Sequence, residues 1–195
     1  MRVAVQAASL ALVGAVAASV PAAAQGADGF SRTSHKGTFG PVKGGHVPRA
    51  VTYDERLVPK GARIKVVDEG ADGATRISLR VAGVARGHHF GAHVHTKPCG
   101  PKPDDSGPHY QNVRDPHQPS TDPKYANPRN EVWLDFTSGL LGHGESSAVQ
   151  RWKFRAGQAR SLVLHEHGTE TGPGHAGQAG DRVACFSVPF GESRR

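Results

Sequence analysis

Several features that define other kinds of protein are missing from this sequence. Beyond its N-terminus, the chain has no apolar run long enough to cross a lipid bilayer. No segment keeps the apolar periodicity of a helix, and none of the usual nucleic-acid-binding motifs occurs. These absences exclude a multi-span membrane protein, a helical bundle and a dedicated nucleic-acid-binding protein. Cysteine is also scarce, with two residues, whereas histidine is abundant, with twelve.

The N-terminus predicts export. Arg2 is followed by residues 3–20 without a charge, and Pro21-Ala22-Ala23-Ala24 closes the stretch. One basic residue, an apolar stretch and small residues at the cleavage positions are typical of a secretory signal peptide. We therefore expect a cleaved signal peptide over residues 1–24 and a secreted or periplasmic protein, the alternative being a retained membrane anchor.

Export determines how the two cysteines are interpreted. In an oxidising compartment, Cys99 and Cys185 have no third partner and most simply form one disulfide bond, the alternative being two buried free thiols. A disulfide that closes so long a loop stabilises the fold by about 4 kcal/mol, through the entropy that it removes from the unfolded chain.

The chain is basic, with a formal net charge of +7. Such a balance suits a nucleic acid, an anionic cell surface or a small anionic substrate. The basic residues are scattered over candidate strands, which argues against a nucleic-acid partner; they include Arg76, Arg80, Arg151, Lys153 and Arg155. The partners that remain are a small anion and a loose association with an anionic cell surface. The sequence does not indicate an oligomeric state.

The expected mature chain divides into a leader, a domain and a tail. Residues 25–46 have only Phe30, Phe39 and Val42 as apolar points, so we expect a flexible leader that buries too little surface to fold and that could contact an anionic surface. Residues 47–191 form the predicted domain, and residues 192–195 form the tail.

Within the domain, short alternating or apolar runs are separated by turn residues. This pattern predicts an all-β sandwich or barrel; the runs are 63–66, 76–81, 90–95, 132–136, 149–154, 161–165 and 183–188. A turn cluster at residues 68–73 predicts a hairpin between the first two runs. Residues 97–130 are rich in proline and irregular, and a loop that long is expected to be functional or tied down. Cys99, His109 and His117 could tie it through a disulfide and a metal.

The strongest functional signal is His93-Val94-His95. In an extended strand, side chains two residues apart leave the same face, so these two imidazoles can aim at one point. The alternative is a pair of solvent-facing histidines on a strand edge. Neutral imidazoles favour copper and zinc among biological metals, and tetragonal nitrogen sets favour Cu(II), so copper is the first choice.

Further motifs follow this pair in a fixed order. They are Cys99, Gly107-Pro108-His109-Tyr110, Val163-Leu164-His165-Glu166 and Gly180-Asp181-Arg182-Val183-Ala184-Cys185. In their order and spacing, these motifs resemble the copper/zinc superoxide dismutase family over roughly residues 48–190. The resemblance implies a Greek-key β-barrel whose long metal-binding loop is residues 97–130.

The resemblance also implies roles for single residues. His109 would be the bridging ligand and would carry a proton in the reduced state, and Arg182 would hold the superoxide anion beside the metal. A guanidinium suits that role because it is always charged and presents a rigid fork of donors. His167 is the rival of His165, but only His165 stands in the V-x-H-E context. The implied copper ligands are His93, His95, His109 and His165.

At the zinc site the sequence departs from the family pattern. His109 and His117 match two expected zinc ligands, but Asn127 and Asn130 stand where a histidine and an aspartate are expected, and amides are poorer zinc ligands. Thr169 stands where the family has an aspartate that links the two metal sites. These departures resemble a copper-only branch of the family and leave zinc binding open; the substitutes, if the loop takes another path, are Asp122, Asp135 and His143.

The sequence thus predicts an exported superoxide dismutase that converts superoxide to dioxygen and hydrogen peroxide by cycling between Cu(II) and Cu(I). The alternative on the same fold is a non-enzymatic secreted copper-binding or copper-buffering protein, because fold and ligands do not guarantee turnover. Arg182 favours the enzyme, since metal storage needs no anion guide.

Overall fold

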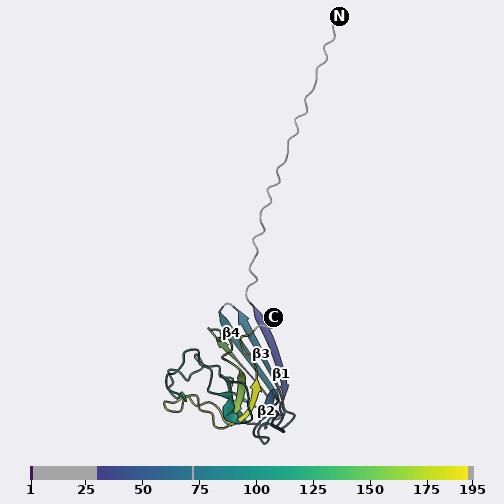
Figure 1. Cartoon of the computed structure of the whole chain (residues 1–195), viewed down its shortest axis with the longest axis vertical. Helices are drawn as coiled ribbons and strands as arrows, with labels where there is room; N and C mark the ends of the chain where they lie inside the picture. Colours follow the sequence, from purple (N-terminus) through teal and green to yellow (C-terminus); the bar gives the residue numbers. More distant parts are fainter. Residues whose placement is uncertain (2–29, 72, 193–195) are drawn as a thin grey trace.

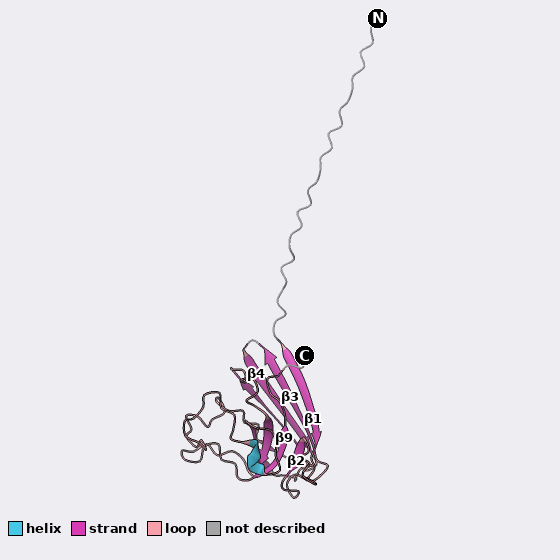
Figure 2. Ribbon diagram, in the orientation of Figure 1, coloured by secondary structure: helices cyan, strands magenta, loops and turns pink. Residues whose placement is uncertain are grey.

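Two antiparallel sheets make up the fold in the computed structural model, which describes residue 1, residues 30–71 and residues 73–192. The four-stranded sheet has the order β1-β3-β4-β7 and the five-stranded sheet the order β2-β9-β8-β5-β6. The strands are β1 Ser31–Thr38, β2 Ala50–Thr52, β3 Arg63–Ala71, β4 Ala74–Ala82, β5 His89–His95, β6 Phe136–Thr137, β7 His143–Gln150, β8 Ser161–His165 and β9 Arg182–Ser187. One 3-10 helix, η1 Pro103–Ser106, is the only helix in the described ranges (Figure 2). The predicted all-β Greek-key class is confirmed.

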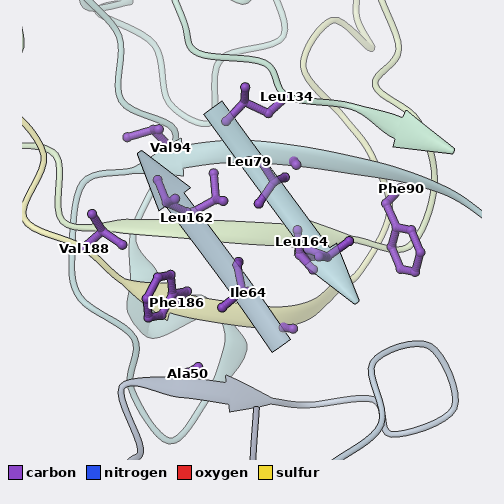
Figure 3. Packing of buried hydrophobic residues seen from close by; sticks show 14 of the residues in the cluster. Ala50, Ile64, Leu79, Phe90, Val94, Leu134, Leu162, Leu164, Phe186 and Val188 are labelled. Atoms are coloured by element: carbon purple, nitrogen blue, oxygen red, sulfur yellow. The ribbon is translucent and has the colours of Figure 1, made fainter. Parts of the chain in front are cut away.

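The core fills the space between the two sheets. Alternating residues of β3 and β4, such as Ile64 and Leu79, point inwards and are 2% and 0% exposed. They meet the inward residues of β5 and β8, among them Phe90 and Leu164, which are fully buried (Figure 3). Since side chains alternate across a strand, the residues between these apolar positions are left for the outer faces of the sandwich.

The predicted hairpin is present, but its strands are longer than expected. The β3–β4 ladder continues to the pair Ala71↔Ala74, so residues 68–71, expected in the turn, lie in β3. Tertiary partners account for this difference. Asp68 accepts a hydrogen bond from the Gly191 backbone N–H at 2.7 Å, and Glu69 pairs with Arg32 of β1.

The prediction of a flexible leader over residues 25–46 is wrong from Ser31 onwards. Residues 31–38 form β1, which pairs with β3 over eight residues, and Phe39 is 1% exposed in the core (Figure 1). Low apolar content did not exclude a strand here, because a polar segment added to the edge of a sheet is held by backbone hydrogen bonds to the neighbouring strand. The folded domain therefore begins before Val47.

The predicted irregular loop of residues 97–130 is confirmed, with η1 as its regular element, and two of its residues tie its first half to the core. Cys99 forms a disulfide with Cys185 of β9, with the two Cα atoms 5.7 Å apart. Further along, the Tyr110 backbone N–H donates to the Val94 carbonyl of β5 at 2.7 Å. The loop therefore returns to lie beside β5, and its irregular course is seen on the left in Figure 1.

No helix in the described part of the chain is long and apolar enough to cross a membrane. Apart from Met1, the predicted signal peptide lies outside the described residues, as do residues 25–29 of the predicted leader and residues 193–195 of the predicted tail.

Candidate metal centre

Four histidines meet on the outer face of the five-stranded sheet. On β5, Phe90, Ala92 and Val94 face the core, so His93 and His95 leave the opposite face. His165 ends β8, the neighbour of β5 in the sheet. His109 reaches the group from the long loop, which forms an isolated antiparallel bridge with His95. The predicted pair and its two distant partners are thus brought together.

The four ring systems converge closely enough to share one ion. One nitrogen of each ring lies within 4.8 Å of the chosen nitrogens of the others, and the Nε2 atoms of His95 and His165 are 3.3 Å apart. His109 is the most accessible member, with its side chain 17% exposed, whereas His93 and His95 are fully buried. His167, the rival of His165, is exposed, and its Nδ1 lies 3.1 Å from the Gly168 carbonyl instead of facing the group.

Three of the rings are oriented by acceptors behind them. Each acceptor binds one ring nitrogen and so places the ring proton there, which leaves the lone pair of the other nitrogen for the centre. The contacts are His95 Nδ1 to the Gly107 carbonyl at 2.8 Å, His165 Nδ1 to the Gly180 carbonyl at 3.4 Å and His109 Nδ1 to Glu131 Oε2 at 2.8 Å.

His93 is oriented in the opposite sense, through its other nitrogen. Its Nε2 lies 2.6 Å from Thr169 Oγ1, and this hydroxyl donates to Asp135 Oδ1 at 2.8 Å. A hydroxyl that gives its proton to a carboxylate accepts from the imidazole, so His93 is protonated on Nε2. Its Nδ1 is buried and has no hydrogen-bond partner in the described ranges. An unpartnered buried nitrogen is costly unless a ligand fills it, which fits a metal ion.

Burial keeps three of these imidazoles in the neutral form that binds metal. Desolvation lowers the pKa of His93 and of His95 well below the usual value, and the neighbouring ring of His109 adds to the effect. Desolvation likewise lowers the pKa of His165 to about 3. Since neutral imidazole nitrogens suit copper and zinc, the chemistry of the donor set fits copper at neutral pH.

Glu131 is the site residue that the sequence analysis missed. It is 1% exposed, and its carboxylate accepts hydrogen bonds from the His109 ring at 2.8 Å, from Gln111 Nε2 at 2.8 Å and from Trp133 Nε1 at 2.7 Å. It follows directly after Asn130, the position at which an aspartate was expected. An acidic residue at the start of the apolar run 132–134 was the signal that could have revealed it.

The predicted zinc ligands are not brought together. His117 is exposed and lies outside the histidine group, which is the only group of three or more histidine, cysteine and acid side chains close enough for an ion in the described part of the chain. The side chain of Asn127 bonds to the backbone of Pro123 and Lys124, and that of Asn130 bonds to the backbone of Val113. Both amides are therefore used to shape the loop.

The three residues considered as substitute zinc ligands do not lie together. Asp135 accepts hydrogen bonds from the backbone N–H and the hydroxyl of Thr169, and its Oδ1 lies 3.7 Å from His93 Nε2. It therefore supports the group of four histidines. Asp122 accepts from the Lys124 backbone N–H at 2.8 Å in the loop. His143 begins β7 in the other sheet.

Arg182 lies beside the histidine group. A cavity of about 300 Å³ is lined by His109, His165 and Arg182, which is space for a small anion and several water molecules. The guanidinium is held through Nη1, which donates to Ser106 Oγ at 2.9 Å and to the Pro103 carbonyl at 3.3 Å. Its positive charge contributes to the lowered pKa of His93, His95 and His165, so it acts on the centre electrostatically.

Comparisons with solved structures show where the same fold occurs. No curated protein matches the chain. Among solved structures, a Cu/Zn superoxide dismutase from Brucella abortus is similar with a TM-score of 0.53 and 20% identity, over 80% of this chain and 99% of that one. A double mutant of a SOD-like protein from Bacillus subtilis has a TM-score of 0.48 and 16% identity, over 63% of this chain and 88% of that one.

A family model covers the part of the chain that builds the centre. Residues 61–188 match the model for copper/zinc superoxide dismutase. This range contains the four converging histidines, the loop that delivers His109, both cysteines of the disulfide and Arg182. Because the match spans more than half of the chain and coincides with the site, the chain belongs to the copper/zinc superoxide dismutase family.

Proposed function

We propose that this protein is an exported superoxide dismutase that works with copper alone. The observation that carries the proposal is the convergence of four histidine nitrogens beside a guanidinium held in place. The nitrogens fit copper, and the guanidinium fits an anionic substrate. Export is supported by the disulfide between Cys99 and Cys185, since such bonds persist in oxidising compartments.

The ligands are His93 through Nδ1 and His95, His109 and His165 through Nε2, each oriented by its outer hydrogen bond. Copper held there would supply the one-electron chemistry, taking an electron from one superoxide and returning it to a second, so that dioxygen and hydrogen peroxide are the products. The protein aims the four rings before the metal arrives, and burial keeps His93, His95 and His165 neutral, which reduces the reorganisation required on binding.

Arg182 attracts and orients the anion. Its Nη1 is fixed by Ser106 and Pro103, so the rest of the planar fork is held at the wall of the 300 Å³ cavity that His109 and His165 also line. A fixed positive charge beside the reacting centre raises the local concentration of a small anion and hence the association rate.

His109 carries the proton. It is the most accessible of the four rings, and a proton taken up at Nε2 would leave an imidazolium whose Nδ1–H still donates to Glu131. The buried carboxylate balances that positive charge, so the ring can hold the proton and deliver it to the reduced substrate. Because Nδ1 of His109 faces Glu131, that nitrogen is not available to a second cation, which supports activity without zinc.

The test is a metal analysis combined with a superoxide-decay assay. We expect one copper per chain, rapid decay of superoxide, and a nitrogen-rich tetragonal signal in electron paramagnetic resonance. The double variant His93→Ala/His95→Ala should lose both the signal and the activity. Copper bound with this signal but without turnover would leave the copper-buffering alternative standing, and an unchanged spectrum in the double variant would refute the ligand assignment.

A further inference from the structure

The outer face of the four-stranded sheet carries a row of basic side chains. Cross-strand register places Lys36 of β1 opposite Lys65 of β3, Lys65 opposite Arg80 of β4, and Arg80 opposite Glu145 of β7. The core-facing residues of these strands alternate with this row, so all four side chains point away from the core. Three cations therefore stand side by side across three neighbouring strands.

This arrangement is unfavourable for the sheet by itself. Like charges directly opposite each other destabilise a strand pair, whereas opposite charges stabilise it. Only Arg80 is compensated, by Glu145 at 3.3 Å, and both of these side chains are more than 70% exposed, so solvent screens the pair. Lys36 and Lys65 form no ion pair in the described part of the chain. The row therefore keeps an excess of positive charge.

A groove of about 1140 Å³ runs over the same face. Arg63 and His143 extend the basic lining at the end of the sheet, and Glu145 is its single carboxylate. The rest of the lining is small, hydroxyl-bearing or aliphatic: Gly37, Thr38, Ile64, Val81, Ala82, Thr137 and Gly144. Among the described residues, no phenylalanine, tyrosine or tryptophan lines the groove, which argues against the stacking platform that a single-stranded nucleic acid requires.

We propose that this groove binds a linear anionic polysaccharide that carries one carboxylate per sugar. Neighbouring strands lie about 4.8 Å apart, so the three cations form a ladder of regularly spaced charges that matches a polymer with one charge per repeating unit. The hydroxyls of Thr38 and Thr137 offer hydrogen bonds to sugar hydroxyls. The exposed Leu140 and Leu141, which a lipid bilayer would favour, are not among the groove residues.

The groove and the metal centre lie on opposite faces of the sandwich. The groove belongs to the outer face of the sheet of β1, β3, β4 and β7, whereas His93 and His95 leave the outer face of the other sheet. A polymer in the groove therefore leaves the cavity beside Arg182 open. Such binding would retain the protein on an anionic polymer while its centre faces the solution, and it does not depend on the proposed function.

The test measures binding of the copper-loaded mature chain to immobilised polygalacturonate at 0.15 M salt. In the variant Lys36→Glu/Lys65→Glu, two attractions become two repulsions, and we expect the Kd to rise at least about tenfold. Lys36→Gln/Lys65→Gln should weaken binding less, and it keeps the test informative if the charge-reversed protein does not fold. The superoxide-decay rate should be unchanged in both variants.

The matched control is Lys43→Glu/Lys153→Glu, which changes the net charge by the same amount at two exposed positions outside the groove. It should retain binding within about threefold. An equal loss in this control, or no binding of polygalacturonate by the unaltered chain, would overturn the proposal. Tighter binding to single-stranded DNA or to phosphatidylglycerol vesicles than to polygalacturonate would also overturn it, in favour of the other class of partner.

Discussion

Replacing Glu131 by glutamine should weaken copper binding, although it only exchanges one carboxylate oxygen for an NH₂ group. The carboxylate has no proton to donate and accepts from three groups: Oε2 from His109 and Trp133, and Oε1 from Gln111. Glutamine has the same shape but presents one acceptor and one donor. No placement of its amide satisfies all three neighbours.

The cost can be worked out from these contacts. If the amide oxygen keeps the Oε2 position, the amide NH₂ faces Gln111 Nε2, and two donors oppose each other. Gln111 cannot turn its own amide freely, because its Oε1 accepts from the Asp115 backbone at 2.9 Å and from Gln118 at 3.3 Å. An unsatisfied buried group costs about 1–3 kcal/mol of folding stability.

The loss of charge affects the metal directly. An anionic acceptor raises the basicity of the histidine to which it is bonded, and removing such an outer partner typically lowers metal affinity about 10- to 100-fold, or about 1.4–2.7 kcal/mol. Copper affinity can be measured by competition with a chelator of known affinity, and the geometry by electron paramagnetic resonance. The catalytic rate constant should fall as well, because the neutral amide no longer balances the protonated ring.

Gln111→Leu is the matched control, because it removes one hydrogen bond to Glu131 but leaves the charge beside His109. It should lower stability by a similar amount and change copper affinity less than about threefold. Unaltered copper affinity, spectrum and rate constant in a folded Glu131→Gln protein would refute the role assigned to the carboxylate. If Gln111→Leu lowered copper affinity more than Glu131→Gln does, packing and not the charge of Glu131 would explain the effect.

Four further outcomes are expected. Arg182→Glu should lower the rate constant about tenfold or more and abolish its decline with added salt, with copper content unchanged; a rate that keeps its value and salt dependence would contradict the anion guide. Thr169→Val should leave Nε2–H of His93 without an acceptor and weaken copper binding about 10- to 100-fold, and equal affinity by chelator competition would argue against this support. Protein loaded with copper alone should match the activity of protein given both metals, and a stoichiometric zinc that raises the rate would disprove the copper-only proposal. Metal-free protein should lose stability as pH falls below 6.5. Burial lowers the pKa of His165 to about 3 in the folded protein, so at these pH values His165 takes up a proton only in the unfolded chain. The expected loss is about 2 kcal/mol at pH 5, and a free energy of unfolding in urea that does not change with pH would contradict it.

The histidine group that we propose to hold copper could be predicted from sequence because its signals are local and ordered. His93 and His95 share a strand face by simple alternation, and His165 stands in a short motif that separates it from His167. The disulfide followed from having two cysteines in a chain expected to be exported. The His93–His95 pair needed only strand geometry and the disulfide only counting, whereas His109 and His165 were assigned from the family resemblance. The structure brings the four side chains together and forms the disulfide.

What the sequence could not indicate depends on long-range packing. Glu131 acquires its meaning only when the loop brings His109 against it, and Thr169 reaches Asp135 across 34 residues of sequence. The leader was misjudged for a similar reason. Its strand is polar, and its stability comes from the open edge of β3, which no property of residues 31–38 reveals.

The two faces of strand β5 have different roles, and this makes its register against β8 important for correct folding. Phe90, Ala92 and Val94 fill the core, while His93 and His95 lie between and beyond them on the opposite face. A slip of one residue against β8 would exchange these sets, placing two imidazoles in the hydrocarbon interior and apolar groups at the metal position. If copper binds there as proposed, only the native pairing aims both imidazoles at the ion, so copper binding would stabilise the correct strand alignment over the slipped one.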